Sequence, residues 1–229
     1  TMSSHHWLLA WLGLELNTLS ILPIIMNPQH PRATEATTKY FLIQTMAAAL
    51  ILFASILNAL QTGQWSITDQ AGVLTNNILL MAIMLKMGIA PAHMWYPEVL
   101  QGTTITTAMI ISTWQKLAPL SLLYLTINHM PTNTLLILGL TSTMLGGWLG
   151  LNQTQTRKIL AFSSISHMGW LMVALTINPS LTTLTMIMYL IMTTATFLCM
   201  TTLTTKTLLD LGVAWSQSPT LMASMTMPL

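Results

Sequence analysis

The sequence predicts an all-α fold, a polytopic bundle of transmembrane helices. Hydrophobic residues make up 53% of the chain and charged residues only 5%, and the mean hydropathy is +0.65. A soluble domain carries about 25% charged residues, so this chain cannot cover a water-facing surface. Its apolar runs lack the alternation of apolar and polar residues that is typical of an outer-membrane β-barrel. The spans are therefore expected to be helices.

Seven spans follow from the lengths of the apolar runs, since a helix needs about 20 apolar residues to cross a bilayer. Clusters of Pro, Asn, Gly and Thr separate them, as expected for turns. The chain begins at Thr1 and ends in another apolar stretch, 219–229. We therefore expect a single membrane domain, 1–229, that is partial and truncated at both ends. The predicted spans are 7–26, 40–60, 76–95, 103–127, 132–151, 158–177 and 181–203.

The charges outside the spans agree with this count. The basic residues other than the two deep lysines all lie in the loops on one side, at 27–39, 96–102, 152–157 and after 203, or at the edge of these loops. The opposite loops and the N-terminus hold none. Positive residues favour the side from which a chain is inserted, which predicts that the N-terminus faces the translocated side. The basic residues are Arg32, Lys39, Arg157, Lys158 and Lys206.

Two lysines lie deep in predicted spans. Lys86 follows Asn76 by ten residues, which is roughly 15 Å of helix and about half of the hydrocarbon core. Lys116 lies about as deep in the next span. Each is followed by a proline, Pro91 or Pro119, which removes a backbone hydrogen bond and breaks or bends a helix. Freed carbonyls and water can solvate a buried lysine, and ion-translocating folds use broken helices at this depth. The pattern indicates a hydrated proton path.

Glu15 lies at a depth similar to that of Lys86, in the first span. A buried carboxylate stays ionised where it meets a lysine, so the two could form a pair that switches when the acid is protonated. The alternative is a static ion pair that holds two helices together, although buried pairs stabilise poorly.

His93 and His167 leave two interpretations open. Each is either a buried histidine bonded to a serine or a backbone carbonyl, or a proton relay near the lysines, since histidine titrates near neutral pH.

Glu98, next to Trp95 and Tyr96, is expected at the membrane surface, where aromatic residues gather. The sequence has no phosphate-binding loop, CxxC or HExxH motif, so we expect no redox cofactor and no metal in this chain. A net charge of +2 gives no reason to expect nucleic acid as a partner.

Several stretches resemble one known family. They are HHWLLAWLGLELN, NPQHPRATEATTKYFLIQ (two residues longer than the family pattern), LKMGIAPAHMWYPEVLQG, WQKLAPLSLLY and GGWLGLNQTQTRKILAFSSISHMGW. In this order they cover most of residues 5–170. They resemble the antiporter-like membrane subunits of animal mitochondrial NADH:ubiquinone oxidoreductase, respiratory complex I.

The resemblance implies that this chain is part of a proton-pumping enzyme. Glu15 would match the family's glutamate, Lys86 its broken-helix lysine and Lys116 the next lysine on a hydrated axis. A further family lysine, in the C-terminal part, has no equivalent here, and Lys206 does not match it. NAD, flavin, Fe–S clusters and ubiquinone would lie on other subunits. The partners would be other membrane-arm subunits and lipid, and the location the mitochondrial inner membrane.

Two other functions stay open from the residues alone. A free-standing cation/proton antiporter uses the same buried acid and lysines, and would transport without partner subunits. A structural membrane-arm subunit would use its buried charges only to hold helices in place. Removing those charges would then harm assembly and leave the proton yield unchanged.

Overall fold

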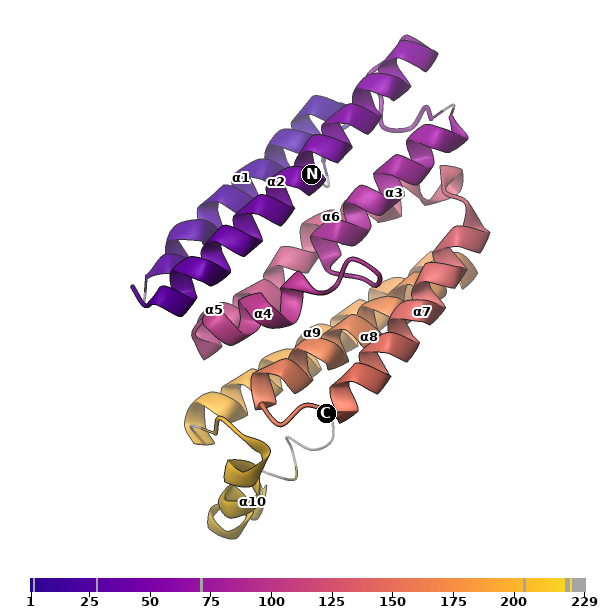
Figure 1. The fold of residues 1–229 in the computed structure, drawn as a ribbon. Coiled ribbons are helices and arrows are strands. Elements are labelled where there is room, and N and C mark those ends of the chain that lie inside the picture. The colour runs from indigo at the N-terminus through magenta and orange to yellow at the C-terminus, as the bar shows by residue number, and fades with distance from the viewer. Residues whose placement is uncertain (2, 28, 71, 204, 221–222, 224–229) are drawn as a thin grey trace.

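A computed structural model describes residues 1, 3–27, 29–70, 72–203, 205–220 and 223. Every regular element in these residues is a helix, which confirms the predicted all-α class. Figure 1 shows the long helices side by side, running nearly parallel or antiparallel. The elements are α1 (Trp7–Met26), α2 (Pro31–Thr62), α3 (Val73–Met87), α4 (Trp95–Gly102), α5 (Ile105–Ser112), α6 (Trp114–Thr126), the 3₁₀ helix η1 (Ile127–His129), α7 (Thr132–Leu151), α8 (Thr156–Ile177), α9 (Pro179–Leu203) and α10 (Leu208–Gln217).

The described chain crosses the bundle seven times, as predicted. Five helices, α1, α2, α7, α8 and α9, are long and apolar enough to cross a membrane on their own. The other two crossings are divided into shorter helices, α3 followed by α4 and α5 followed by α6. Contacts between a helix start and a loop mark the two ends of the bundle. At one end the Trp7 N–H donates to the Trp65 carbonyl at 3.0 Å, and at the other Arg157 Nη1 donates to the Thr103 carbonyl at 2.5 Å.

The third crossing breaks at Gly88, three residues before the expected Pro91. Gly88 has φ 70°, and its N–H bonds to the carbonyls at the end of α3. Glycine enters this left-handed region without the steric cost that a side chain adds, and it therefore ends helices readily. The predicted loop at 96–102 is wrong, because α4 is helical there. Tyr96, Val99 and Leu100 lie on one buried face of α4, and the burial of that face stabilises the short helix.

The fourth crossing was predicted as one helix over 103–127, but the structure divides it at Thr113. The hydroxyls of Ser112 and Thr113 both donate to the Met109 carbonyl, at 2.9 and 2.7 Å. Such side-chain bonds to the preceding turn compete with the helical ladder and bend it. Pro119, where the proline pattern placed the disturbance, lies inside α6.

Two segments predicted as loops are helical. Residues 31–39 form the first turns of α2, which has 32 residues and is about 48 Å long. Pro31 supplies a φ suited to the first turn, and the charged turns extend beyond a core of about 30 Å. After 203, α10 begins at a reciprocal cap in which Thr207 bonds the Asp210 N–H and Asp210 bonds the Thr207 N–H. Most of the predicted apolar stretch 219–229 lies outside the described residues.

α7 and α8 approach each other closely through glycine. A Cβ atom added at Gly146 would lie 2.8 Å from the Ser166 nitrogen and 2.9 Å from the Phe162 oxygen, both on α8. Such distances leave no room for a side chain. Small residues allow this kind of approach between membrane helices, and packing therefore explains Gly146. A Cβ at Gly147 would meet nothing within 4 Å, and packing does not explain that glycine.

Candidate functional site

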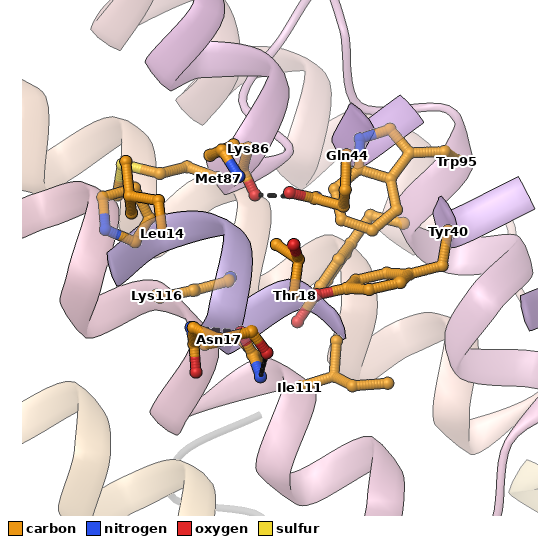
Figure 2. Close-up of a pocket in the computed structure, with 13 residues that line it drawn as sticks. Leu14, Asn17, Thr18, Tyr40, Gln44, Lys86, Met87, Trp95, Ile111 and Lys116 are labelled. Carbon is orange, nitrogen blue, oxygen red and sulfur yellow. Dashed lines mark hydrogen bonds between the residues drawn. The ribbon is translucent and has the colours of Figure 1, made fainter. Parts of the chain in front are cut away.

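A small polar cavity lies where the two broken crossings meet α1 and α2. Its volume is about 20 Å³, which is room for about one water molecule. Figure 2 shows Lys86 and Lys116 among the residues that line it. The lining residues are Leu14, Asn17, Thr18, Tyr40, Gln44, Lys86, Met87, Trp95, Tyr96, Ile111, Gln115, Lys116 and Pro119.

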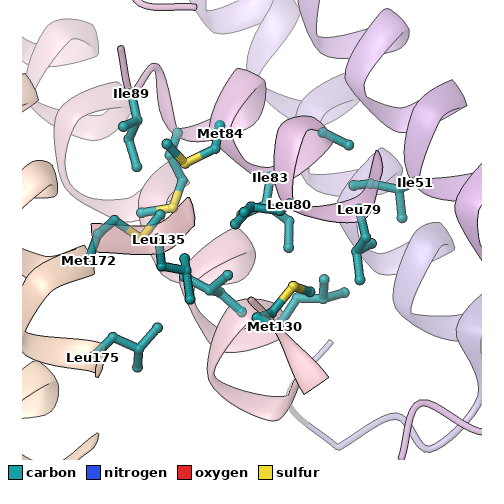
Figure 3. Packing of buried hydrophobic residues seen from close by; sticks show 14 of the residues in the cluster. Ile51, Leu79, Leu80, Ile83, Met84, Ile89, Met130, Leu135, Met172 and Leu175 are labelled. Atoms are coloured by element: carbon teal, nitrogen blue, oxygen red, sulfur yellow. The ribbon is translucent and has the colours of Figure 1, made fainter. Parts of the chain in front are cut away.

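An apolar cluster packs around α3, which also lines the cavity. Figure 3 shows Leu80, Ile83 and Met84 of α3 beside Leu135 and Met172 from α7 and α8. All five side chains are buried. These apolar side chains form low-dielectric surroundings for the cavity, in which charges interact more strongly than in bulk water.

Lys86 occupies the last turn of α3. Its side chain is 7% exposed, and its Nζ has no hydrogen-bond partner among the described residues. The backbone carbonyl of Lys86 accepts a hydrogen bond from Gln44 Nε2 at 3.4 Å (Figure 2). The carbonyl end of a helix carries partial negative charge, which favours a cation in the last turn. The break at Gly88 thus puts Lys86 at a site that stabilises an ammonium without pairing it to a carboxylate.

Glu15 and Lys86 do not form the predicted ion pair. No nitrogen–oxygen distance between them is within 4.0 Å, and the ion pairs found in the described part of the chain join Lys39 to Glu35 and Glu98. The Glu15 carboxylate lies within electrostatic range of Lys86 and accepts a weak hydrogen bond from Thr18 at 3.5 Å. The separation leaves the two charges coupled through space and not through contact.

Lys116 has closer contacts than Lys86. It is 2% exposed and is the third residue of α6, just after the break at Thr113. Its Nζ donates to the Tyr189 hydroxyl at 3.4 Å. The same nitrogen lies 4.5 Å from the centroid of the Tyr96 ring and 5.4 Å from that of the Tyr189 ring. A cation is attracted to the face of an aromatic ring, most strongly where water is excluded.

His93 lies between α3 and α4 and is 5% exposed. It does not line the cavity. Neither of its ring nitrogens makes a well-aligned hydrogen bond to the described residues, and its ring meets that of Phe162 edge to face at 6.5 Å. The backbone of Pro91 nevertheless lies close enough to act on the ring, so the predicted contact with a backbone carbonyl stays a prediction.

His167 is exposed in the described structure, so the prediction that it is buried is wrong. Nearby Ser163, Ser164 and Ser166 donate instead to carbonyls of their own helix. The His167 ring lies 5.7 Å from that of Tyr189, on an apolar groove between α8 and α9. His167 therefore approaches the Lys116 site through Tyr189.

Sequence reasoning missed several polar residues of the site. Asn17 Nδ2 donates to Gln115 Oε1 at 2.6 Å and joins α1 to α6. Both residues, and Gln44, are amides within apolar runs, and this was the signal that could have identified them. Tyr96 was expected near the membrane surface but is buried and lines the cavity, and Tyr189 gave no such signal. Glu98 is exposed and pairs with Lys39 at 2.7 Å, in agreement with a surface position. Trp95, however, is buried, so the predicted gathering of aromatic residues at the surface is wrong there.

Comparison with known proteins gives a consistent family. A family model described as "NADH:quinone oxidoreductase/Mrp antiporter, TM" matches residues 4–228. The "NADH-ubiquinone oxidoreductase chain 2" of Carassius auratus is 54% identical over 224 residues, which cover 98% of this chain and 64% of that protein. The protein of the same name from Gallus gallus is 52% identical over 229 residues, covering 100% of this chain and 66% of that one. The chain thus spans 64–66% of the length of these relatives.

Solved structures show the same fold. A chain of respiratory complex I from Thermus thermophilus with bound aureothin superposes with a TM-score of 0.81 at 28% identity, covering 87% of this chain and 47% of that chain. A chain of the membrane-bound sulfane sulfur reductase, an archaeal respiratory membrane complex, gives 0.80 at 17% identity, covering 91% of this chain and 48% of that chain. The second likeness concerns the fold alone.

Proposed function

Since this chain belongs to the NADH:quinone oxidoreductase/Mrp antiporter transmembrane family, we propose that it is a membrane subunit of proton-pumping NADH:ubiquinone oxidoreductase, respiratory complex I. It supplies one proton-translocation module, and electron transfer from NADH to ubiquinone on other subunits drives it. Those subunits hold the NAD, flavin, Fe–S clusters and ubiquinone. The partners are other membrane-arm subunits, and the location is the mitochondrial inner membrane. The names of relatives at 52–54% identity support this proposal.

The observation that carries the mechanism is a single cavity lined by two buried lysines, each next to a helix break. A charged side chain at membrane depth is costly and is usually functional. The two ammonium groups repel each other across the small cavity, so protonation of one favours loss of a proton from the other. Water in the cavity can carry a proton between them. The arrangement therefore suits lateral proton transfer from Lys86 to Lys116.

Glu15 sets the charge on Lys86 in this scheme. While Glu15 is ionised it favours the ammonium form of Lys86. When Glu15 takes up a proton, that support is lost and Lys86 releases its proton toward Lys116. Because the two groups are not in contact, Glu15 can change its charge without a rearrangement of α1 against α3.

A native gel tests whether the chain works inside the large enzyme. Gently solubilised membranes would be separated, stained for NADH oxidation and probed with an antibody raised against residues 159–170. Co-migration with a very large NADH-oxidising band is expected. Migration only as a small species would contradict the proposal and favour the free-standing cation/proton antiporter.

A further inference from the structure

Tyr189 connects three parts of the Lys116 site although it lies 73 residues further along the chain. It belongs to α9, and its side chain is 3% exposed. Its hydroxyl donates to the Ser112 carbonyl at 2.7 Å and accepts from Lys116 Nζ at 3.4 Å. Its ring lies 5.7 Å from the ring of His167. Tyr189 therefore contacts Lys116, the end of α5 and His167 together.

The Tyr189 hydroxyl is oriented by the helix break. Ser112 is the last residue of α5, where the carbonyls lose their helical partners. A tyrosine hydroxyl has one proton to donate, and here the Ser112 carbonyl receives it. The hydroxyl therefore offers only a lone pair to Lys116. This arrangement stabilises the ammonium form of Lys116 and fixes its position relative to the break.

The surroundings of Lys116 make this hydroxyl its main polar support. Among the described residues, the one hydrogen bond of Lys116 Nζ is to Tyr189. The Tyr96 ring adds an attraction through its face. Of the titratable side chains on the elements around Lys116, those that line its cavity or lie within electrostatic range of it are Tyr40 on α2, Lys86 on α3, Tyr96 on α4, His167 on α8 and Tyr189 on α9. Glu15 on α1 acts on Lys86 and Tyr40.

We propose that Tyr189 is a positioning residue for proton transfer at Lys116, because its hydroxyl ties the ammonium group to the broken end of α5 and its ring contacts His167. This inference rests on the proposed proton-translocating function. The hydroxyl keeps its own proton throughout. A movement of α5 against α6 at Thr113 changes the distance from Lys116 to its acceptor, which couples the charge of Lys116 to the geometry of the break.

The test is Tyr189→Phe in the full-length chain of the assembled, purified enzyme. Phenylalanine keeps the ring beside Lys116 and His167 and removes only the oxygen. Without its acceptor the ammonium form loses support, so the alkaline limb of the pH profile of coupled NADH:ubiquinone turnover is expected to move to lower pH by about half a unit. NADH oxidation with an artificial electron acceptor is expected to be unchanged.

Tyr124→Phe is the matched control, because Tyr124 is 41% exposed and does not line the cavity. It is expected to leave the alkaline limb of the pH profile in place.

Tyr189→Gln is the second variant. Its amide can donate to the Ser112 carbonyl and still accept from Lys116, so it is expected to restore part of the limb's position even if the phenylalanine variant assembles poorly.

An alkaline limb that is unmoved in assembled Tyr189→Phe enzyme would overturn the inference. An equal shift of the alkaline limb in the phenylalanine and glutamine variants would overturn the inference as well. Lys116→Gln separates this outcome from failure of the proposed function. Full proton pumping in Lys116→Gln would contradict the function itself, whatever Tyr189 does.

Discussion

The two cavity lysines are held in different ways at the scale of single residues. Lys116 has a hydroxyl acceptor and an aromatic face, whereas Lys86 Nζ has no hydrogen-bond partner in the described part of the chain. The charge of Lys86 therefore depends most on the water in the cavity, on the end of α3 and on the distant Glu15. Lys116 depends more on the position of its aromatic neighbours.

Glu15→Gln is expected to lower the proton yield per NADH oxidised by about tenfold while the amount of assembled enzyme stays unchanged. The reason is that Glu15 acts on Lys86 through space and makes no ion pair that holds α1 in place. Proton uptake in proteoliposomes and native gels would measure the two quantities. Glu98→Gln is the matched control, because an exposed pair contributes only about 0–1 kcal/mol. Loss of assembly with a normal yield in the remaining enzyme would point to a static ion pair.

Part of the site could be predicted at this scale. A lysine within an apolar run is conspicuous, so Lys86 and Lys116 stand out in the sequence. Tyrosine is ordinary in such a run, and the contact of Tyr189 with Lys116 exists only because α9 packs near the break between α5 and α6. The exposure of His167 also depends on tertiary packing, which a single sequence does not reveal.

The functional geometry at the scale of elements comes from two interrupted helices. Gly88 ends α3 so that Lys86 occupies the last turn of that helix, and the break at Thr113 puts the end of α5 beside Lys116. The prolines indicated interrupted helices but misplaced both breaks. Glycine conformation decides the first, and bonds from Ser112 and Thr113 to the preceding turn favour the second. The helix α4 was missed because its sequence follows a predicted span and is too short to show a clear period.

Gly146→Ala is expected to lower the thermal stability of the assembled enzyme, since its methyl group would collide with the backbone of α8. Overpacking of this kind costs about 1–3 kcal/mol. Loss of the native-gel band during heating would measure it. Gly147→Ala is the matched control, because a Cβ there meets nothing within 4 Å and alanine favours a helix by about 0.5–1 kcal/mol. Equal stability of the two variants would contradict the packing of α7 on α8.

The described residues of the whole molecule form one bundle with a basic end. Arg32, Lys39, Arg157, Lys158 and Lys206 all lie at or near that end. The number of crossings could be predicted because apolar length and charge asymmetry both depend on the membrane. Which helices contact each other could not be predicted, because helix contacts in a bilayer depend on small residues and on the shapes of the helix surfaces. The orientation of the basic end across the membrane stays a prediction.

The central claim is that the buried lysines move protons during electron transfer. The most direct measurement is the number of protons translocated per NADH oxidised by purified enzyme in proteoliposomes, comparing Lys86→Met with Lys206→Met. Lys206 is exposed and lies outside the cavity, so its variant is expected to keep the full yield. Lys86→Met is expected to assemble and to oxidise NADH with an artificial acceptor normally while its proton yield falls. An unchanged proton yield in Lys86→Met would contradict the account.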